Sequence, residues 1–274
     1  MVDNMDTVRW GVERVKYMLK RVPFVVGLWK ACRKTAGAFR AAVSIIRRKG
    51  LVETLRGFGL LQLYARLRKL KVPAELYKEE YYLGQGGCEG VEEFKDYYGE
   101  KLSKRLASVL DEIQDIDGHR FLDLGCGRGE ILLHLERTAS HVVGIDYSAA
   151  AVEISRTIAK KSEVIQADVV RFLPQLQTEP FDGILMIDIA EHLFDWELEI
   201  VFKHVDRLLK PQGCLYIDTP LIPDRPYSEM HVNIKQDAKQ YLRFLPDFTI
   251  EKEMLTDPRG SNYLIILSKR GDCA

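Results

Sequence analysis

The sequence lacks the cysteine pattern that a disulfide framework or a structural zinc site requires. Its five cysteines are odd in number, are scattered along the chain, and include no C-x-x-C pair. Disulfides persist in oxidising compartments, and structural zinc sites use closely spaced cysteine pairs. We therefore expect a reducing compartment, with the cytoplasm as the default location.

Long hydrophobic runs are also missing. The longest uncharged runs in the amino-terminal part, VPFVVGLW and GFGLLQLYA, are only eight or nine residues long, whereas a membrane-spanning helix needs about 20 residues. The opening MVDNMDTVRW has neither a basic leader nor an apolar core. No secretory signal is therefore predicted.

Net charge is zero, but it is divided unevenly along the chain. Residues 1–78 hold 18 lysines and arginines against 5 acidic residues, and residues 79–274 hold 22 against 35. Helical spacing of apolar residues within 8–22 and 51–70 predicts a basic helical extension over 1–78. This extension either docks on the acidic domain, as a cap or a dimerisation arm, or lies on an anionic membrane surface. No nucleic-acid-binding module is recognisable, so no nucleic acid partner is expected.

Residues Lys101 to Ile113 are predicted to form a helix, and after it short apolar runs alternate with helical patterns. This rhythm predicts an α/β fold with a parallel sheet covered on both faces. The last two runs, DFTIEKEML and SNYLIILSK, are joined by TDPRG and predict a hairpin, so the last strand is antiparallel. The predicted strands are HRFLDLG, HVVGIDY, EVIQADVV, FDGILMIDIA, GCLYIDTP and the two runs of the hairpin.

The first predicted strand leads into LDLGCGRGE, residues 122–130, with glycines at alternate positions: Gly125, Gly127 and Gly129. Ligands of such sheets bind beyond the carboxyl ends of the strands. One glycine would suffice for a turn, so three predict a ligand close to the backbone. A nicotinamide fingerprint, G-x-G-x-x-G, needs a glycine where this chain has Glu130. That departure disfavours a nicotinamide-dependent oxidoreductase.

Acidic residues follow the next three strands: Asp146, Asp168 and Asp188. Together with Asp123 they predict an acidic rim along the sheet edge. Such a rim suits a cationic ligand with an adenosine part and repels a pyrophosphate. Any one of these acids is more often a helix cap or a solvated residue, but four in series favour a binding site.

The chain from about Arg120 to its end resembles the class I S-adenosylmethionine-dependent methyltransferases. LDLGCGRGE matches their first motif, and GIDYS, QADV, FDGILMIDIAEHL and LLKPQGCLYIDTP match the later motifs in order. The resemblance implies a Rossmann-like seven-stranded sheet, with S-adenosylmethionine as cofactor and S-adenosylhomocysteine as product. It also divides 79–274 into a lid and helical lead-in, 79–118, and a core, 119–274. A weaker resemblance of EEYYLGQGGCEGVEEFKDYYGEKLSKRL points to bacterial methyltransferases that act on glycans and small molecules.

The resemblance implies a cofactor-binding role for Asp123, Gly125, Cys126, Gly127, Gly129, Asp146, Tyr147, Asp168, Val169 and Asp188. The glycines let the backbone lie against the methionine part, and Asp123 supports the loop and the amino group. Asp146 holds the ribose and Tyr147 lies beside the adenine. Asp168 meets the adenine amino group, and the Val169 N–H meets a ring nitrogen.

An oxygen acceptor must lose a proton, and histidine is the commonest base for this step. His192 follows the fourth strand and His231 lies in a long loop after the fifth, so both are predicted catalytic residues. Asp188, Glu191 and His192 also resemble the D/E-x-x-E-H arrangement of some quinone O-methyltransferases, in which a divalent metal is plausible. A solvated face explains these residues equally well, so no metal is predicted.

The acceptor is predicted to be a hydroxyl. Methyltransferases that act on amines usually carry D/N-P-P-Y after strand four, where this chain reads DIAEH. The favoured activity is therefore O-methylation of a small molecule, a sugar or a lipid-linked metabolite. Aromatic residues of the lid, Tyr81, Tyr82, Phe94 and Tyr97, either shape the acceptor pocket or simply pack on the sheet. The alternative function is a non-catalytic protein that binds S-adenosylmethionine and is recruited through its basic arm.

Overall fold

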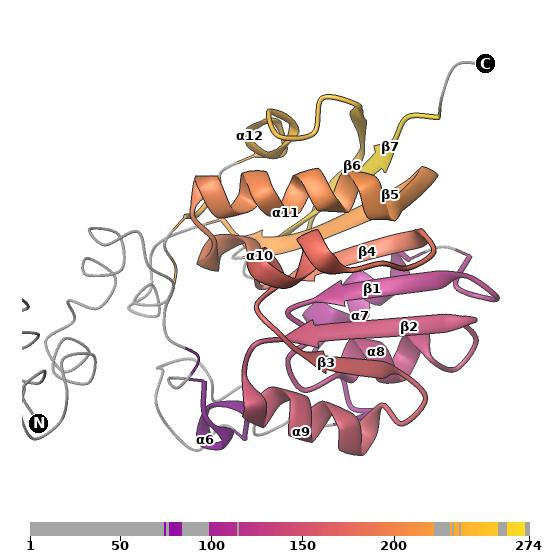
Figure 1. Cartoon of the computed structure of the whole chain (residues 1–274), viewed down its shortest axis with the longest axis vertical. Helices are drawn as coiled ribbons and strands as arrows, with labels where there is room; N and C mark the ends of the chain where they lie inside the picture. Colours follow the sequence, from indigo (N-terminus) through magenta and orange to yellow (C-terminus); the bar gives the residue numbers. More distant parts are fainter. Residues whose placement is uncertain are drawn as a thin grey trace, which may run out of the picture. The chain divides into compact units, whose positions relative to one another are not determined.

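One mixed sheet forms the centre of the protein, as a computed structural model shows (Figure 1). The structure describes residues 74, 77–83, 99–113, 115–221, 231, 233–235, 237–256 and 262–271. The strands among these residues are β1 (Arg120–Leu124), β2 (His141–Asp146), β3 (Glu163–Gln166), β4 (Phe181–Ile187), β5 (Leu209–Pro220), β6 (Phe248–Leu255) and β7 (Asn262–Lys269). Their order across the sheet is β3-β2-β1-β4-β5-β7-β6.

The direction of the strands agrees with the sequence pattern. β3, β2, β1, β4 and β5 are parallel neighbours, with β1 paired to both β2 and β4. β7 runs antiparallel between β5 and β6. The predicted parallel sheet with an antiparallel last strand is therefore confirmed. The change of strand order at β1, which has β2 on one side and β4 on the other, places a ligand site at the carboxyl ends of these strands.

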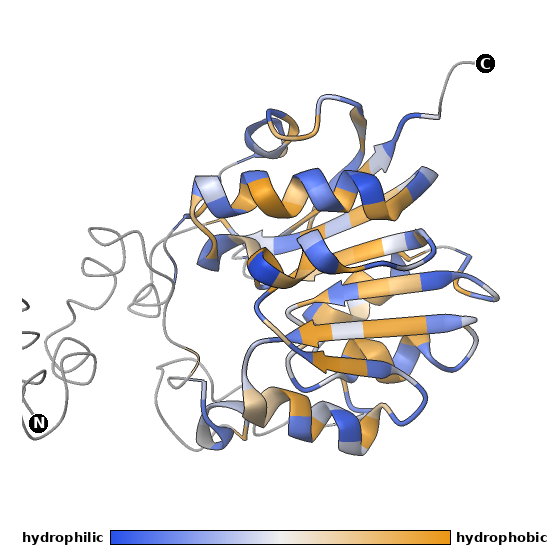
Figure 2. Cartoon of the chain, viewed as in Figure 1, coloured by the Kyte–Doolittle hydropathy of each residue, from blue (hydrophilic) through white to orange (hydrophobic). Residues whose placement is uncertain are grey.

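Helices cover both faces of this sheet. The structure describes α6 (Glu79–Tyr82), α7 (Lys104–Asp111), α8 (Glu130–Leu135), α9 (Ala149–Ile158), α10 (Val169–Phe172), α11 (Asp195–Leu208) and α12 (Lys239–Leu242), with short 3-10 turns at Leu173–Gln175 and at Ala190–His192, the latter called η4. Buried side chains of α10, α11 and α12 pack in one core, and those of α7, α8 and α9 pack in another. The strands between them are largely apolar, whereas hydrophobic and hydrophilic residues alternate along the helices (Figure 2).

Successive apolar side chains of a strand contribute alternately to the two cores. In β4, Ile184 and Met186 join the α11 side, and Leu185 and Ile187 join the α8 side. Successive side chains of a strand point to opposite faces, so a strand buried on both faces reads as a continuous apolar run.

One predicted strand is shorter than expected. EVIQADVV was expected to be extended throughout, but β3 ends at Gln166 and α10 begins at Val169. The Asp168 side chain accepts a hydrogen bond of 2.9 Å from the Val170 N–H and so caps this helix. The predicted helix over 101–113 is present as α7, where Ser103 is the cap and accepts from the Leu106 N–H.

The chain divides between residues 60 and 61, and all the described residues belong to the second unit, 61–274. The helices predicted over 8–22 and 51–70 lie outside the described residues, and the boundary at residue 78 stays a prediction. Tyr77, just before that boundary, is buried and accepts a 2.7 Å hydrogen bond at its carbonyl from the Ser148 hydroxyl. Within the described ranges, no helix has both the length and the apolar character needed to cross a membrane.

Candidate functional site

The glycine-rich loop after β1 requires glycine at all three alternate positions. Gly125, Gly127 and Gly129 have φ angles of +77°, +52° and +83°, which is the left-handed region that other residues rarely adopt. The expectation that one glycine would suffice for this turn was wrong. A Cβ on Gly125 would lie 2.9 Å from the Ile189 Cδ1, whereas a Cβ on Gly127 would face open space. Gly127 is therefore where the loop backbone can meet a ligand.

Asp146, at the end of β2, holds this loop in place. Its carboxylate accepts from the Gly127 N–H at 3.0 Å and from the Ser148 N–H at 2.8 Å. Burial raises the pKa of this carboxyl, and the hydrogen bonds from Ser148 and Gly127 act in the opposite direction. Asp146 thus shapes the loop in addition to its predicted contact with a ribose.

Asp123, on β1 beneath the loop, has a buried carboxylate oxygen with no hydrogen-bond partner among the described residues. Its pKa is raised to about 7 by burial, by Asp146 and by Glu130. A buried carboxyl without a partner is costly. A ligand with positive charge, such as a sulfonium or an ammonium group, would supply what this oxygen lacks, so the residues present fit the predicted cofactor.

The predicted adenosine-binding residues lie at neighbouring strand ends. Asp168 caps α10 through its Oδ1, which is the helix-capping role that the sequence indicated as the alternative to ligand binding. Val169 is the first residue of the same helix and is buried. Tyr147 follows Asp146, and its ring lies against the ring of Tyr77 with centroids 5.5 Å apart. The fold brings these side chains to the sheet edge that the sequence predicted, and their contacts with a cofactor stay predictions.

Asp188, after β4, forms an ion pair with Arg105. Arg105 of α7 binds Asp188 with one guanidinium nitrogen and the fully buried Asp218 of β5 with the other. Asp218 also accepts from the Thr256 hydroxyl at 2.6 Å and from the Asn262 amide at 3.2 Å. Burial raises the pKa of Asp218, and Arg105 lowers it. Asp188 therefore anchors α7 to the sheet, and its predicted role with the cofactor stays a prediction.

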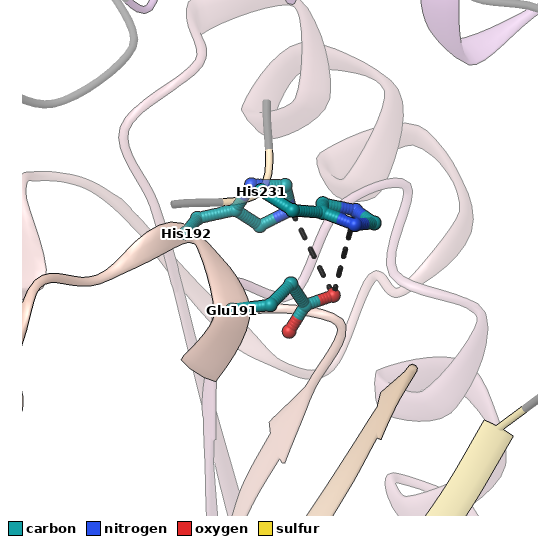
Figure 3. Close-up of side chains that lie close together, drawn as sticks. All are labelled: Glu191, His192 and His231. Atoms are coloured by element: carbon teal, nitrogen blue, oxygen red, sulfur yellow. Dashed lines mark ion pairs between the residues drawn. The ribbon is translucent and has the colours of Figure 1, made fainter. Parts of the chain in front are cut away.

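Both predicted catalytic histidines meet at a buried carboxylate (Figure 3). Nε2 of His192 lies 3.9 Å from Oε1 of Glu191, and Nε2 of His231 lies 4.0 Å from the same oxygen. The two imidazole rings stand nearly edge to face with centroids 5.0 Å apart. We call Glu191, His192 and His231 the histidine cluster.

Burial sets the charges of the histidine cluster. Glu191 is 1% exposed, and its other carboxylate oxygen lies 3.3 Å from the Thr219 hydroxyl, which donates to it. The pKa of Glu191 is raised well above its usual range by burial, with Asp188 adding to the effect. Burial and the neighbouring His192 lower the pKa of His231 to about 3. His231 is therefore neutral at physiological pH.

The histidine cluster could also hold a divalent metal, since each residue offers one ligand atom and these atoms lie within 4.8 Å of one another. Ligand atoms around a tetrahedral zinc ion, at about 2.0–2.1 Å from it, lie roughly 3.3 Å apart. The wider spacing of the cluster instead suits an oxygen held by hydrogen bonds of about 2.7–3.0 Å. The prediction that no metal binds stays a prediction.

The segment around α6 contacts the glycine-rich loop. The Arg128 guanidinium in the glycine loop donates to the Tyr82 carbonyl at 2.9 Å. Tyr82 is buried and Tyr81 is partly buried, whereas the other two lid aromatics, Phe94 and Tyr97, lie outside the described residues.

Three residues of the site were absent from the predicted set. Glu191 was named in the D/E-x-x-E-H arrangement but was given no role in the predicted site, although burial makes it the centre of the histidine cluster. Its place in DIAEH, directly after a buried strand, was the available signal. No sequence signal marked Arg105 or Tyr77, because their contacts join residues 83 to 115 positions apart.

Comparison with known proteins agrees with this geometry. Residues 122–217 match the family model described as a methyltransferase domain. The ubiquinone biosynthesis O-methyltransferase of Chelativorans sp. (strain BNC1) is 34% identical over 168 residues, which cover 56% of this chain and 64% of that protein. The enzyme of the same name from Brucella ovis is 27% identical over 165 residues, covering 59% of this chain and 64% of its own length. The chain thus spans slightly less than two thirds of these relatives.

Solved structures show the same fold. An S-adenosylmethionine dependent methyltransferase from Mesorhizobium loti superposes with a TM-score of 0.51 at 17% identity, covering 61% of this chain and 98% of that one. The PH0226 protein from Pyrococcus horikoshii OT3 superposes with a TM-score of 0.50 at 25% identity, covering 61% of this chain and 89% of that one. With its glycine-rich loop, its acidic strand ends and its antiparallel last strand, this chain is therefore similar to the S-adenosylmethionine-dependent methyltransferases in fold, and residues 122–217 match a methyltransferase domain.

Proposed function

We propose that the protein is an O-methyltransferase that transfers the methyl group of S-adenosylmethionine to a phenolic hydroxyl of a small molecule. The histidine cluster carries this proposal, because it gathers two imidazoles and a buried carboxylate, two of them directly after β4, at the sheet edge where the donor is predicted to bind. The relatives from Brucella ovis and Chelativorans sp. are O-methyltransferases of ubiquinone biosynthesis, which supports a hydroxyl acceptor.

S-adenosylmethionine supplies an electrophilic methyl group on a sulfonium. The chain's own task is to bind the acceptor in line, to exclude water and to take up the hydroxyl proton. His192 is the better base, because a pKa of about 3 makes His231 a poor proton acceptor. His231 and Glu191 hold the hydroxyl oxygen in place, and Glu191 stabilises the imidazolium that forms on His192.

The character of the histidine cluster favours a phenol over an aliphatic alcohol. A phenolic hydroxyl has a pKa of about 10, as in tyrosine. Imidazole can remove such a proton while the methyl group is transferred, whereas an aliphatic hydroxyl is a far weaker acid. An acceptor screen must compare phenols with compounds that carry sugar or lipid hydroxyls.

Calorimetric titration with S-adenosylhomocysteine tests the donor site first. We expect the parent chain to bind, and Asp146→Ala to bind at least tenfold more weakly, which is about 1.4 kcal/mol. The reason is that Asp146 holds the Gly127 amide and, as proposed, the ribose. Glu153→Ala on α9, an exposed position, is the control and should bind as the parent does. Absence of binding to the parent would overturn the proposed function.

Transfer of labelled methyl from S-adenosylmethionine to catechol then tests the acceptor class. We expect methylated phenol from the parent and none from a cyclohexanediol of similar size. Equal labelling of the two compounds would contradict a phenolic acceptor. Binding of S-adenosylhomocysteine without transfer to any hydroxyl would favour the non-catalytic alternative.

We further propose that residues 1–78 contact an anionic membrane surface. Their excess of 13 positive charges supports this, because each basic residue near such a surface contributes about 1 kcal/mol. The chain should sediment with vesicles of anionic lipid at low salt and leave them at high salt. Equal sedimentation with neutral vesicles would contradict the proposal. A cytoplasmic location stays a prediction.

A further inference from the structure

Tyr77 stands between the donor side and the acceptor side of the site. Its ring lies 5.5 Å from that of Tyr147, next to the predicted ribose ligand, and 6.1 Å from the imidazole of His192. Its hydroxyl oxygen lies 3.4 Å from Nδ1 of His192. The backbone here is fixed by the 2.7 Å hydrogen bond from the Ser148 hydroxyl to the Tyr77 carbonyl. The Tyr77 side chain is therefore held in a defined place.

Two polar neighbours surround this hydroxyl. Tyr77 and Tyr147 share a side-chain hydrogen bond, and Nδ1 of His192 lies 3.4 Å from the Tyr77 oxygen. A phenol carries one proton and can both donate and accept. The Tyr77 hydroxyl can therefore donate to Tyr147 and accept from His192 at the same time.

We propose that Tyr77 is a positioning residue that fixes the tautomer of His192, by accepting a hydrogen bond from its Nδ1–H. This inference deepens the proposed function and rests on His192 as the base. With the proton on Nδ1, Nε2 carries the lone pair. Nε2 is the atom that faces Glu191 at 3.9 Å within the histidine cluster. A general base needs its unprotonated nitrogen on the acceptor side, so the opposite tautomer would not work.

This arrangement also links the two substrates. The path His192 Nδ1–H to Tyr77 O–H to Tyr147 runs from the base to the residue predicted to lie beside the adenine. A cofactor packed against Tyr147 would hold Tyr77 in the orientation that His192 needs. The base is then set for proton uptake when the donor is in place.

Tyr77→Phe tests the inference, because it keeps the ring and its aromatic contacts and removes only the hydroxyl. The first readout is ¹⁵N NMR of the imidazole nitrogens in the full chain with S-adenosylhomocysteine, with the His192 signals identified by their loss in His192→Gln. In the parent we expect a protonated Nδ1 and an unprotonated Nε2. In Tyr77→Phe the proton should move largely to Nε2. The matched control is Tyr216→Phe, a buried tyrosine of β5 that lies in the α8 core.

Methylation of catechol is the second readout. Tyr77→Phe should lower kcat at least tenfold and change the affinity for S-adenosylhomocysteine less than threefold. The same tautomer in parent and variant, or a parent with Nε2 protonated, would overturn the inference. A large loss of affinity for S-adenosylhomocysteine without a change of tautomer would also overturn it, because Tyr77 would then only support the structure of the donor site. A parent that methylates no phenol contradicts the proposed function instead, and leaves the tautomer result to decide on Tyr77.

Discussion

Replacing Arg105 by methionine is expected to lower the free energy of unfolding by about 3 kcal/mol at pH 7. Methionine keeps most of the aliphatic volume of arginine, so the loss of stability measures the contribution of the guanidinium charge. Asp218 would then keep its hydrogen bonds to Thr256 and Asn262 but lose the guanidinium that compensates its buried charge. Urea denaturation followed by circular dichroism measures the effect.

The pH dependence of this loss has a definite sign. Burial raises the folded-state pKa of Asp218 above its unfolded value, and loss of Arg105 raises it further. A carboxyl with a raised pKa binds more protons in the folded state than in the unfolded state, so stability increases as the pH falls. The deficit of Arg105→Met should therefore be largest above the raised pKa and should shrink as the pH falls through it.

Two further variants separate charge from packing. The double variant Arg105→Met with Asp218→Asn removes both charges and should recover part of the lost stability at pH 7. Arg137→Met, which breaks the exposed pair with Glu100, should cost less than about 1 kcal/mol. A loss for Arg105→Met that is independent of pH and is not reduced in the double variant would contradict the electrostatic explanation.

His192→Ala is expected to lower kcat for a phenolic acceptor by about 10²–10⁴-fold, the usual contribution of a general base. Affinity for S-adenosylhomocysteine should stay within threefold of the parent, because the donor-holding contacts lie at the glycine loop and the end of β2. His231→Ala should cost less, since a neutral imidazole of low pKa holds the acceptor without taking its proton. Steady-state kinetics together with calorimetry measure both quantities.

His204→Ala on α11 is the control, because this partly exposed histidine lies outside the histidine cluster. Dialysis against a chelator is the second control and should leave the parent's rate unchanged. A rate that is lost on dialysis and restored by a divalent cation would show that the histidine cluster holds a metal. An unchanged kcat in His192→Ala would show that the proton leaves by another route.

Local features of the chain sufficed to predict much of the fold. The alternation of apolar runs with helical patterns gave the sheet and its covering helices, because side-chain periodicity depends only on the backbone geometry of each element. The glycines of LDLGCGRGE marked the loop, since few other residues tolerate a φ of +52° to +83°. The end of β3 was misplaced because a single capping side chain, that of Asp168, outweighed the apolar run that continues beyond it.

Three contacts were decided only by the tertiary structure. His231 joins Glu191 and His192 through the path of the chain after β5, Arg105 reaches Asp188 and Asp218 when α7 docks, and Tyr77 meets His192 across 115 residues. No local propensity encodes such distances, because they depend on how separately formed elements pack together. The sequence by itself therefore determined the kind of donor site this protein has. Packing decided which side chains face the acceptor and which charges compensate one another.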